Sequence, residues 1–249
     1  MYLLFKKNLI YLKFLLSRFL RHTGLCSLFY IKQEKFIIRF FPSSISTTLW
    51  FDKSYSEDDY KTIKKFIKKG ATFVDVGANI GHLSLYAKTC VGSEGKVIAI
   101  EGNSRIFKFL KENIKINNFE IDAYFNLIGN EEKKVSIQNR KADDMNQVLE
   151  NIYDNDNIIN MVTLDSICTN LETIDLLKID VEGYEYNVLQ GATKTLEKTK
   201  ILMIEIINDL AKDFGNSFIE TKDLIISSGF KLENNENENN YIFKKNNKN

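Results

Sequence analysis

The sequence ATFVDVGANIG, at residues 71–81, joins a short apolar run to two glycines that stand four positions apart. An apolar run without clean alternation is typical of a strand buried on both faces of a parallel sheet. Gly77 permits a tight turn after the strand, and Gly81 permits backbone or ligand to approach closely. A group bound there would face the free N–H groups of the following helix. A plain turn capped by Asn79 would have the same sequence, so this stretch alone predicts a strand, a turn and a helix.

Four more apolar runs follow the same pattern and alternate with helical segments. They are KVIAIEG at 96–102, DAYFNLIG at 122–129, IDLLKID at 174–180 and KILMIEII at 200–207. Apolar residues recur on one face in the segments 104–118 and 184–198, which predicts helices. This order predicts an α/β fold with a doubly wound, mostly parallel sheet and helices on both faces.

The segments outside this repeat have weaker patterns. Residues 28–51 alternate loosely and predict an antiparallel hairpin with Pro42 near its turn, and residues 54–70 predict a helix capped by Ser56 and closed by Gly70. The polar region 139–170 predicts a long connection. Two short apolar runs, 229–233 and 241–245, predict a C-terminal antiparallel hairpin at the sheet edge. We therefore expect four parts, namely an N-terminal helix at 1–24, a hairpin-and-helix extension at 25–70, a main α/β domain at 71–245 and a frayed tail at 246–249.

The first 24 residues are basic and amphipathic. They contain five basic residues and no acidic one, whereas the net charge of the whole chain is only +1. On a helical wheel the basic residues gather on one side, opposite leucines and phenylalanines. This pattern suits the surface of an anionic membrane, and it suits equally a helix docked on its own domain with its basic face in solvent. The uncharged runs are too short for a span of about 20 apolar residues, and no secretory cleavage site follows.

Composition excludes several other classes of protein. Of the 249 residues 44% are hydrophobic and 27% are charged, as in ordinary globular proteins, and the near-neutral balance argues against a nucleic-acid partner. Cys26, Cys90 and Cys168 lie too far apart for a disulfide framework or a C-x-x-C zinc site, and two histidines do not favour a metal site. We expect a reducing compartment, the cytoplasm, with peripheral contact at the inner membrane face through residues 1–24 as an open alternative.

Three acidic positions are expected to surround one crevice. Asp75 stands where a dinucleotide-binding fingerprint needs a glycine, and its carboxylate would repel a pyrophosphate but suit a cationic ligand. Glu101 ends the strand after the glycine turn, where an acidic residue of this architecture binds ribose hydroxyls. Asp180 ends the next parallel strand, and Glu182 and Glu185 extend the acidic cluster. Carboxylates gathered in a cleft suit a cationic ligand, a metal or general-base chemistry on a hydroxyl.

Together these motifs resemble the FkbM-type methyltransferases. VDVGANIGHLSLYA, VIAIEGN, LKENIKINN, TLDSI, LLKIDVEGYEYNVLQGA and IEI occur in the family's order within residues 50–210. The resemblance implies the class I methyltransferase fold, a Rossmann-like sheet of seven strands that binds S-adenosylmethionine (SAM). It also implies methylation of hydroxyl oxygens on sugars, glycans or other small molecules.

The resemblance further implies roles for individual residues. The glycine turn would hold the methionine end of SAM, through Asp75, Gly77, Ala78, Asn79 and Gly81. Glu101 would hold the ribose hydroxyls with Asn103 close by, Asn126 and Leu127 would neighbour the adenine, and Asp180 would lie near the reacting methyl group. The family often has Glu-Pro after the second strand. Here Gly102 follows Glu101, which leaves the loop freer but keeps the carboxylate.

A hydroxyl acceptor needs a base, which typically accelerates such a transfer by about 10²–10⁴-fold. Asp180, Glu182 and His82 are the candidates, and we expect a carboxylate of the Asp180–Glu185 cluster to act. Two other functions stay open at this point. One is a nicotinamide-dependent oxidoreductase on a similar fold, which Asp75 disfavours, and the other is a non-catalytic SAM-binding or membrane-associated protein. We expect no nucleic-acid partner and no metal, and the acceptor is a small molecule or glycan.

Overall fold

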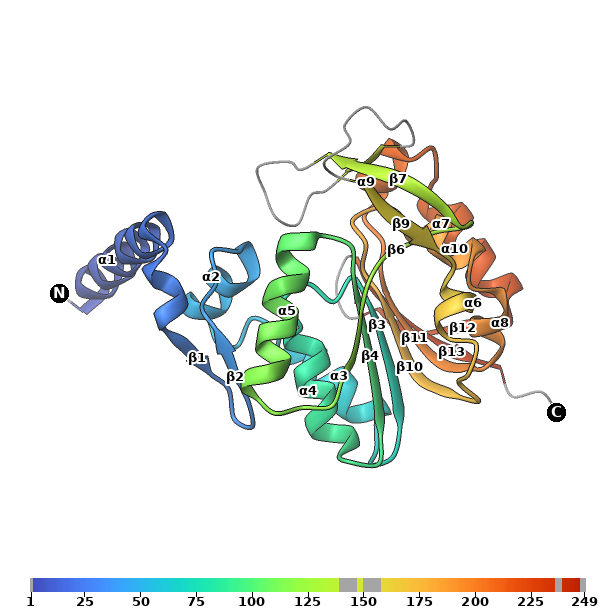
Figure 1. Cartoon of the computed structure of the whole chain (residues 1–249), viewed down its shortest axis with the longest axis horizontal. Coiled ribbons are helices and arrows are strands. Elements are labelled where there is room, and N and C mark those ends of the chain that lie inside the picture. Colours follow the sequence, from blue (N-terminus) through green and yellow to red (C-terminus); the bar gives the residue numbers. More distant parts are fainter. Residues whose placement is uncertain (1, 139–146, 150–157, 236–238, 247–249) are drawn as a thin grey trace.

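The computed structural model describes residues 2–138, 147–149, 158–235 and 239–246. A seven-stranded sheet lies at its centre, with the strand order β12-β13-β11-β10-β3-β4-β5 (Figure 1). Five strands are parallel, and they are β3 (Thr72–Val76), β4 (Lys96–Glu101), β5 (Asp122–Phe125), β10 (Ile174–Ile179) and β11 (Thr199–Glu205). At one edge β12 (Phe230–Asn235) and β13 (Asn240–Lys245) form an antiparallel hairpin, and β13 is antiparallel to β11. This confirms the predicted fold class and its C-terminal hairpin.

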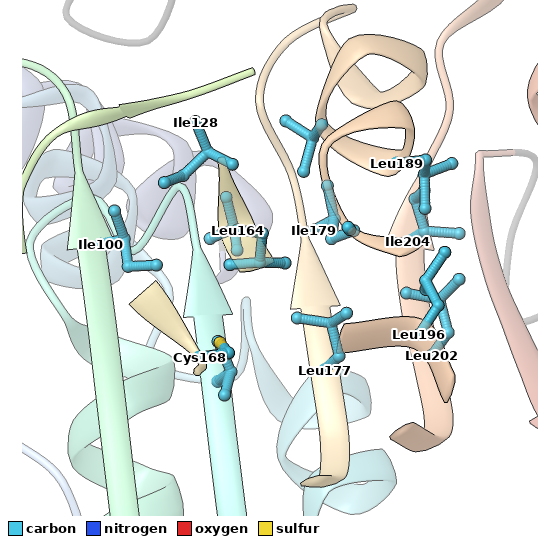
Figure 2. Close-up of a cluster of buried hydrophobic side chains, with 14 of the residues drawn as sticks. Ile100, Ile128, Leu164, Cys168, Leu177, Ile179, Leu189, Leu196, Leu202 and Ile204 are labelled. Carbon is cyan, nitrogen blue, oxygen red and sulfur yellow. The ribbon is translucent and has the colours of Figure 1, made fainter. Parts of the chain in front are cut away.

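Helices cover both faces of this sheet (Figure 1). On one face lie α3 (Glu57–Phe66), α4 (His82–Val91) and α5 (Ser104–Ile116). On the other lie α6 (Leu164–Ile167), α7 (Glu185–Gln190), α8 (Thr193–Glu197) and α10 (Phe218–Ser227). Side chains alternate along β3, since Phe73 packs with Leu83 of α4, whereas Val74 shares a core with Leu189 and Leu196. Figure 2 shows part of that second core. Burial on both faces explains why the strand sequences are continuously apolar.

A second, four-stranded sheet lies beside the carboxyl edge of the first. Its strands are β6 (Leu127–Ile128), β7 (Lys133–Gln138), β8 (Gln147–Leu149) and β9 (Ile158–Val162), in the order β6-β9-β7-β8. The prediction of a single strand at 122–129 is therefore wrong, because β5 and β6 belong to different sheets. The prediction of one long connection at 139–170 is wrong for β8, β9 and α6. Alternate burial of Ile159 and Met161 forms a half-buried strand within this polar region. Residues 139–146 and 150–157 lie outside the described residues.

The extension before the main domain differs from its prediction. It contains α1 (Tyr2–Thr23), a 3-10 helix η1 (Leu25–Leu28), the hairpin β1 (Tyr30–Lys32) and β2 (Ile37–Arg39), and α2 (Ser44–Phe51). Pro42 follows the hairpin instead of lying at its turn, and residues 44–51 are helical. The reason is the cap, since the Ser43 hydroxyl accepts a hydrogen bond from the N–H of Ser46 at 3.2 Å. This cap outweighs the β-branched composition of α2.

Two helix boundaries also differ. α3 ends at Phe66, before Gly70, and Ser56 precedes it without a side-chain cap. The helix predicted at 184–198 is divided into α7 and α8, which are separated by Gly191 and Ala192. No helix in the described part of the chain is long and apolar enough to cross a bilayer. The proposed domain boundaries stay predictions, and most of the expected frayed tail lies outside the described residues.

Candidate active site

A cavity of about 300 Å³ opens at the carboxyl ends of the parallel strands. It lies where the strand order reverses, because β3 pairs with β4 on one side and with the later strand β10 on the other. Open α/β sheets bind ligands at this position. Nine of the predicted site residues line it, namely Gly77, Asn79, His82, Glu101, Asn103, Asn126, Leu127, Asp180 and Glu182. The other three, Asp75, Ala78 and Gly81, do not line the cavity.

The turn after β3 is shaped by close contact with the end of β10. Gly77 has a φ of +77°, and a Cβ placed there would lie 1.8 Å from the backbone oxygen of Asp180. Its N–H and that of Ala78 both donate to the carbonyl of Ile100, at 3.0 and 2.9 Å. Only glycine fits this position, as expected for a residue that forms the tight turn after the strand. The Ala78 methyl and Gly81 serve packing instead, since Ala78 is in the core and a Cβ on Gly81 would meet the side chain of Leu110.

Glu101 is held in place by two backbone groups. Its Oε2 accepts from the N–H of Asn79 at 2.9 Å, and its Oε1 accepts from the N–H of Asn103 at 2.7 Å. Burial raises the pKa of Glu101, and these two hydrogen bonds oppose that rise. Each carboxylate oxygen has a second lone pair, so Glu101 can still accept from a ligand in the cavity. The Asn103 side chain caps α5 by accepting from the N–H groups of Arg105 and Ile106.

Beneath the cavity lies a buried ion-paired cluster. Asp75 is fully buried, and its Oδ2 accepts a 2.5 Å hydrogen bond from the Ser84 hydroxyl. Lys178 Nζ lies 3.3 Å from Asp75 Oδ1 and 3.1 Å from Asp180 Oδ2, and it donates to the carbonyl of Gly77 at 3.1 Å. Asp75 therefore neutralises Lys178 instead of facing the cavity. Sequence analysis did not assign Lys178 or Ser84 to the site, because a lysine within an apolar strand carries no local sign of a buried partner.

A pair of carboxyl groups faces the cavity at the ends of β10 and β11. Asp180 is 32% exposed, and Glu205 is hydrogen-bonded to it through the side chains. Burial, together with the charge of Asp180 and this hydrogen bond, raises the pKa of Glu205 to about 7. Two carboxyl groups this close cannot both ionise freely, so the pair holds a proton near neutral pH. Sequence analysis missed Glu205. The signal was its place at the end of an apolar strand, in the IEI motif.

A smaller chamber of about 110 Å³ adjoins the first. The two share Tyr55, His82, Lys178, Asp180 and Glu205, and the smaller one is lined also by Asp59 and Asn240. His82 is 8% exposed, and its Nδ1 has no hydrogen-bond partner among the residues that the structure describes. Burial, aided by the charge of Lys178, lowers the pKa of His82 to about 3. The imidazole is therefore neutral at physiological pH.

The remaining acids of the cluster differ in position. Glu182 lines the larger cavity and has a φ of +54°. Glu185 does not extend the acidic cluster into either chamber. It is 2% exposed, and its Oε1 accepts from the N–H groups of Val181 and Gly183 at 3.1 and 3.0 Å. Glu185 therefore shapes the loop after β10, because the folded loop presents two N–H groups that need an acceptor.

Comparison with known families identifies the chain. The FkbM methyltransferase domain matches residues 75–234. The chain belongs to this family. The match confirms the resemblance seen in the sequence and makes the protein a SAM-dependent methyltransferase, in agreement with the strand order of its sheet. The nicotinamide-dependent oxidoreductase that the sequence left open is thereby disfavoured.

Several solved structures are similar to this chain, and two of the following three are described as a methylase or a methyltransferase. A putative rRNA methylase from Clostridium thermocellum shares 13% identity over 76% of this chain and 95% of its own, with a TM-score of 0.47. A SAM-dependent methyltransferase from Aquifex aeolicus shares 18% identity over 77% of this chain and 90% of its own, with a TM-score of 0.44. Aeropyrum pernix fibrillarin, solved in complex with SAM, shares 10% identity over 75% of this chain and 73% of its own, with a TM-score of 0.46.

Proposed function

We propose that this FkbM-family enzyme binds SAM in the larger cavity and methylates a hydroxyl oxygen of a small molecule or glycan held in the smaller one. The observation that carries the proposal is the Asp180–Glu205 pair, which lies where the two chambers meet. A carboxyl pair with one pKa of about 7 is suited to accept a proton from a hydroxyl group at neutral pH.

The residues of the larger cavity fit SAM. Glu101 offers two acceptor oxygens to a vicinal diol, and its backbone hydrogen bonds fix their direction. Gly77 lines this cavity, and the acidic groups of Asp180, Glu182 and Glu205 suit a sulfonium cation. Asn126 and Leu127 line the side next to Glu101, where we place the adenine. Asp75 acts on the cofactor only indirectly, by holding Lys178 beneath the turn.

The smaller chamber suits a neutral or cationic acceptor with hydroxyl groups. Three carboxyl groups line it, from Asp59, Asp180 and Glu205. They would repel the phosphates of a nucleic acid, so we propose no nucleic-acid acceptor. The imidazole of His82 also lines this chamber, although its Nδ1 is buried from solvent. Its lowered pKa makes His82 a poor base, which leaves the proton to the carboxyl pair.

The reaction then depends on position and on one proton transfer. When bound, SAM would supply an electrophilic methyl group to the acceptor oxygen and would leave as S-adenosylhomocysteine. The chain holds the acceptor at the junction of the chambers, and orientation alone accounts for a large part of the acceleration of such transfers. The ionised carboxyl of the Asp180–Glu205 pair takes the hydroxyl proton. Lys178 lies 3.1 Å from Oδ2 of Asp180 and places a positive charge beside the pair.

The test is methyl transfer to defined acceptors. The purified chain would be incubated with SAM and a panel of sugars, glycans and small alcohols, and separately with transfer RNA and ribosomal RNA. Mass spectrometry would detect the methyl ether. We expect methylation in the first panel, with a rate that rises with pH through about 7 as Glu205 loses its proton. Methylation of RNA alone, or of a nitrogen or carbon acceptor alone, would contradict the proposal.

Variants separate the chemistry from binding. In Asp180→Asn and Glu205→Gln we expect turnover to fall by about 10²–10⁴-fold. For Glu205→Gln, SAM binding measured by calorimetry should change little, because the amide keeps the hydrogen bond to Asp180. Glu197→Gln, an exposed acid on α8, is the matched control and should behave as wild type. Normal turnover in both active-site variants would remove the carboxyl pair from the mechanism.

A further inference from the structure

The N-terminal helix and the segment after it expose an unusual amount of apolar surface. More than half of the exposed large hydrophobic side chains among the described residues lie between Phe14 and Tyr30. Phe19 is 58% exposed and Leu28 is 70% exposed. Contiguous apolar patches of this kind on a folded protein mark interaction surfaces. We call residues 14–30 the N-terminal apolar surface.

This surface is not used to attach α1 to its own protein. Ser17 is fully buried and Leu20 is 5% exposed, and Leu20 belongs to the core that also contains Cys26 and Ile31. Leu15, Leu16 and Phe19 are 43–58% exposed. The sequence left open whether the apolar face docks on the domain or faces outward, and in the structure Leu20 packs on the protein whereas Leu15, Leu16 and Phe19 face outward. In Figure 1, α1 extends away from the sheet at one end of the molecule.

The charge of the segment complements an anionic surface. Lys13 and Arg18 are exposed on the same helix, and no acidic residue precedes Glu34. Phosphate-bearing headgroups attract basic residues that lie near the membrane surface. Apolar side chains then insert at the boundary between headgroups and acyl chains. The surface thus provides both of the contributions that reversible membrane binding needs.

We propose that residues 14–30 bind the surface of a bilayer that contains anionic lipids. A bilayer fits better than a second copy of the chain. Residues 1–24 carry five basic residues and no acidic one, so two such helices would repel each other. An anionic bilayer surface instead attracts these basic residues. The proposal does not depend on which acceptor the enzyme methylates.

The experiment is vesicle flotation of the full chain. Vesicles of phosphatidylcholine and phosphatidylserine in equal parts would be compared with vesicles of phosphatidylcholine alone. We expect the chain to float with the anionic vesicles, to float less with the neutral ones, and to dissociate partly as salt screens the basic residues. The variant Leu15→Glu/Phe19→Glu should bind anionic vesicles at least about tenfold more weakly, because two apolar side chains are lost from the contact.

A matched control comes from the other end of the molecule. Ile219 on α10 is 68% exposed, and Ile219→Glu should bind vesicles as wild type does. Thermal unfolding of all three proteins would show that the domain is intact, since the substituted side chains are exposed. Failure of the wild type to float with anionic vesicles would overturn the proposal. So would equal flotation of the double variant. A wild-type dimer in light scattering that the double variant dissociates, without flotation, would replace the bilayer with a second copy.

Discussion

The ammonium nitrogen of Lys178 lies 3.1 Å from Oδ2 of Asp180, and both residues stand at the carboxyl end of the same strand. The same nitrogen lies 3.3 Å from Oδ1 of Asp75, which is fully buried. Burial alone would lower the pKa of Lys178, but the charges of Asp180 and Asp75 outweigh burial and raise it. Lys178 is therefore charged at all physiological pH values. It joins the floor of the cavity to the carboxyl group that faces the acceptor.

Replacing Lys178 should lower the free energy of unfolding substantially. In Lys178→Met the carboxylate of Asp75 stays buried without its cation, and breaking a buried pair on one side typically costs about 3–5 kcal/mol. Urea denaturation would measure the loss. The control is Lys200→Met, because Lys200 is 62% exposed where it pairs with Asp175 at 2.7 Å. An exposed pair is worth about 0–1 kcal/mol, so equal losses in the two variants would contradict this account of the cluster.

The proton on Glu205 should make stability depend on pH. The folded protein keeps this proton up to about pH 7, whereas the unfolded chain releases it near the ordinary value of 4.5. The group's contribution is therefore fully present below pH 4.5 and is lost as pH rises towards 7. We expect a loss of about 2 kcal/mol, less than the whole shift implies, because partial exposure screens the group.

Glu205→Gln should remove this dependence, because glutamine does not titrate. Denaturation at a series of pH values, taken as the difference between wild type and variant, would isolate it from other groups. A difference that stays constant between pH 4.5 and 7 would mean that Glu205 ionises normally in the folded protein.

Gly77→Ala should destabilise the fold through contact with the end of β10. The left-handed backbone costs any other residue about 1 kcal/mol. The added Cβ would also lie 1.8 Å from the Asp180 carbonyl oxygen, which adds about 1–3 kcal/mol or more. Gly70→Ala is a matched control, because Gly70 has a φ of +78° and nothing within 4 Å of its Cβ position. Equal losses of melting temperature in the two variants would show that the contact with Asp180 does not add to the destabilisation.

Glu101→Gln should weaken SAM binding without unfolding the protein. Glutamine keeps one acceptor oxygen, but its amide group would face a backbone N–H of Asn79 or Asn103. Loss of a charge-assisted bond typically costs about 1.5–3 kcal/mol, or about tenfold to a hundredfold in Kd. Titration calorimetry would measure Kd, with NAD as the ligand control. An unchanged Kd would place the ribose elsewhere.

Much of the fold was predictable because its information is local. The apolar runs, the turn at Gly77 and the placement of Glu101 follow from residues close together in the sequence. The predicted secondary structure was wrong where a helix cap or packing against a distant segment determined the local conformation. Ser43 makes residues 44–51 helical, and burial of Ile159 and Met161 creates a strand in a polar region. In each case one local hydrogen bond or one distant packing surface outweighed composition.

The sequence by itself determined the family, the order of the elements and which strand ends carry acidic groups. Only the tertiary structure decided which of these acids act together. It buries Asp75 against Lys178 and points the Glu185 carboxylate at the backbone of the loop after β10. It also brings Glu205, at the end of β11, next to Asp180, at the end of β10. It also decides that the apolar side of α1 faces outward. Charge interactions and burial depend on distance in space, and Glu205 follows Asp180 by 25 positions in the chain.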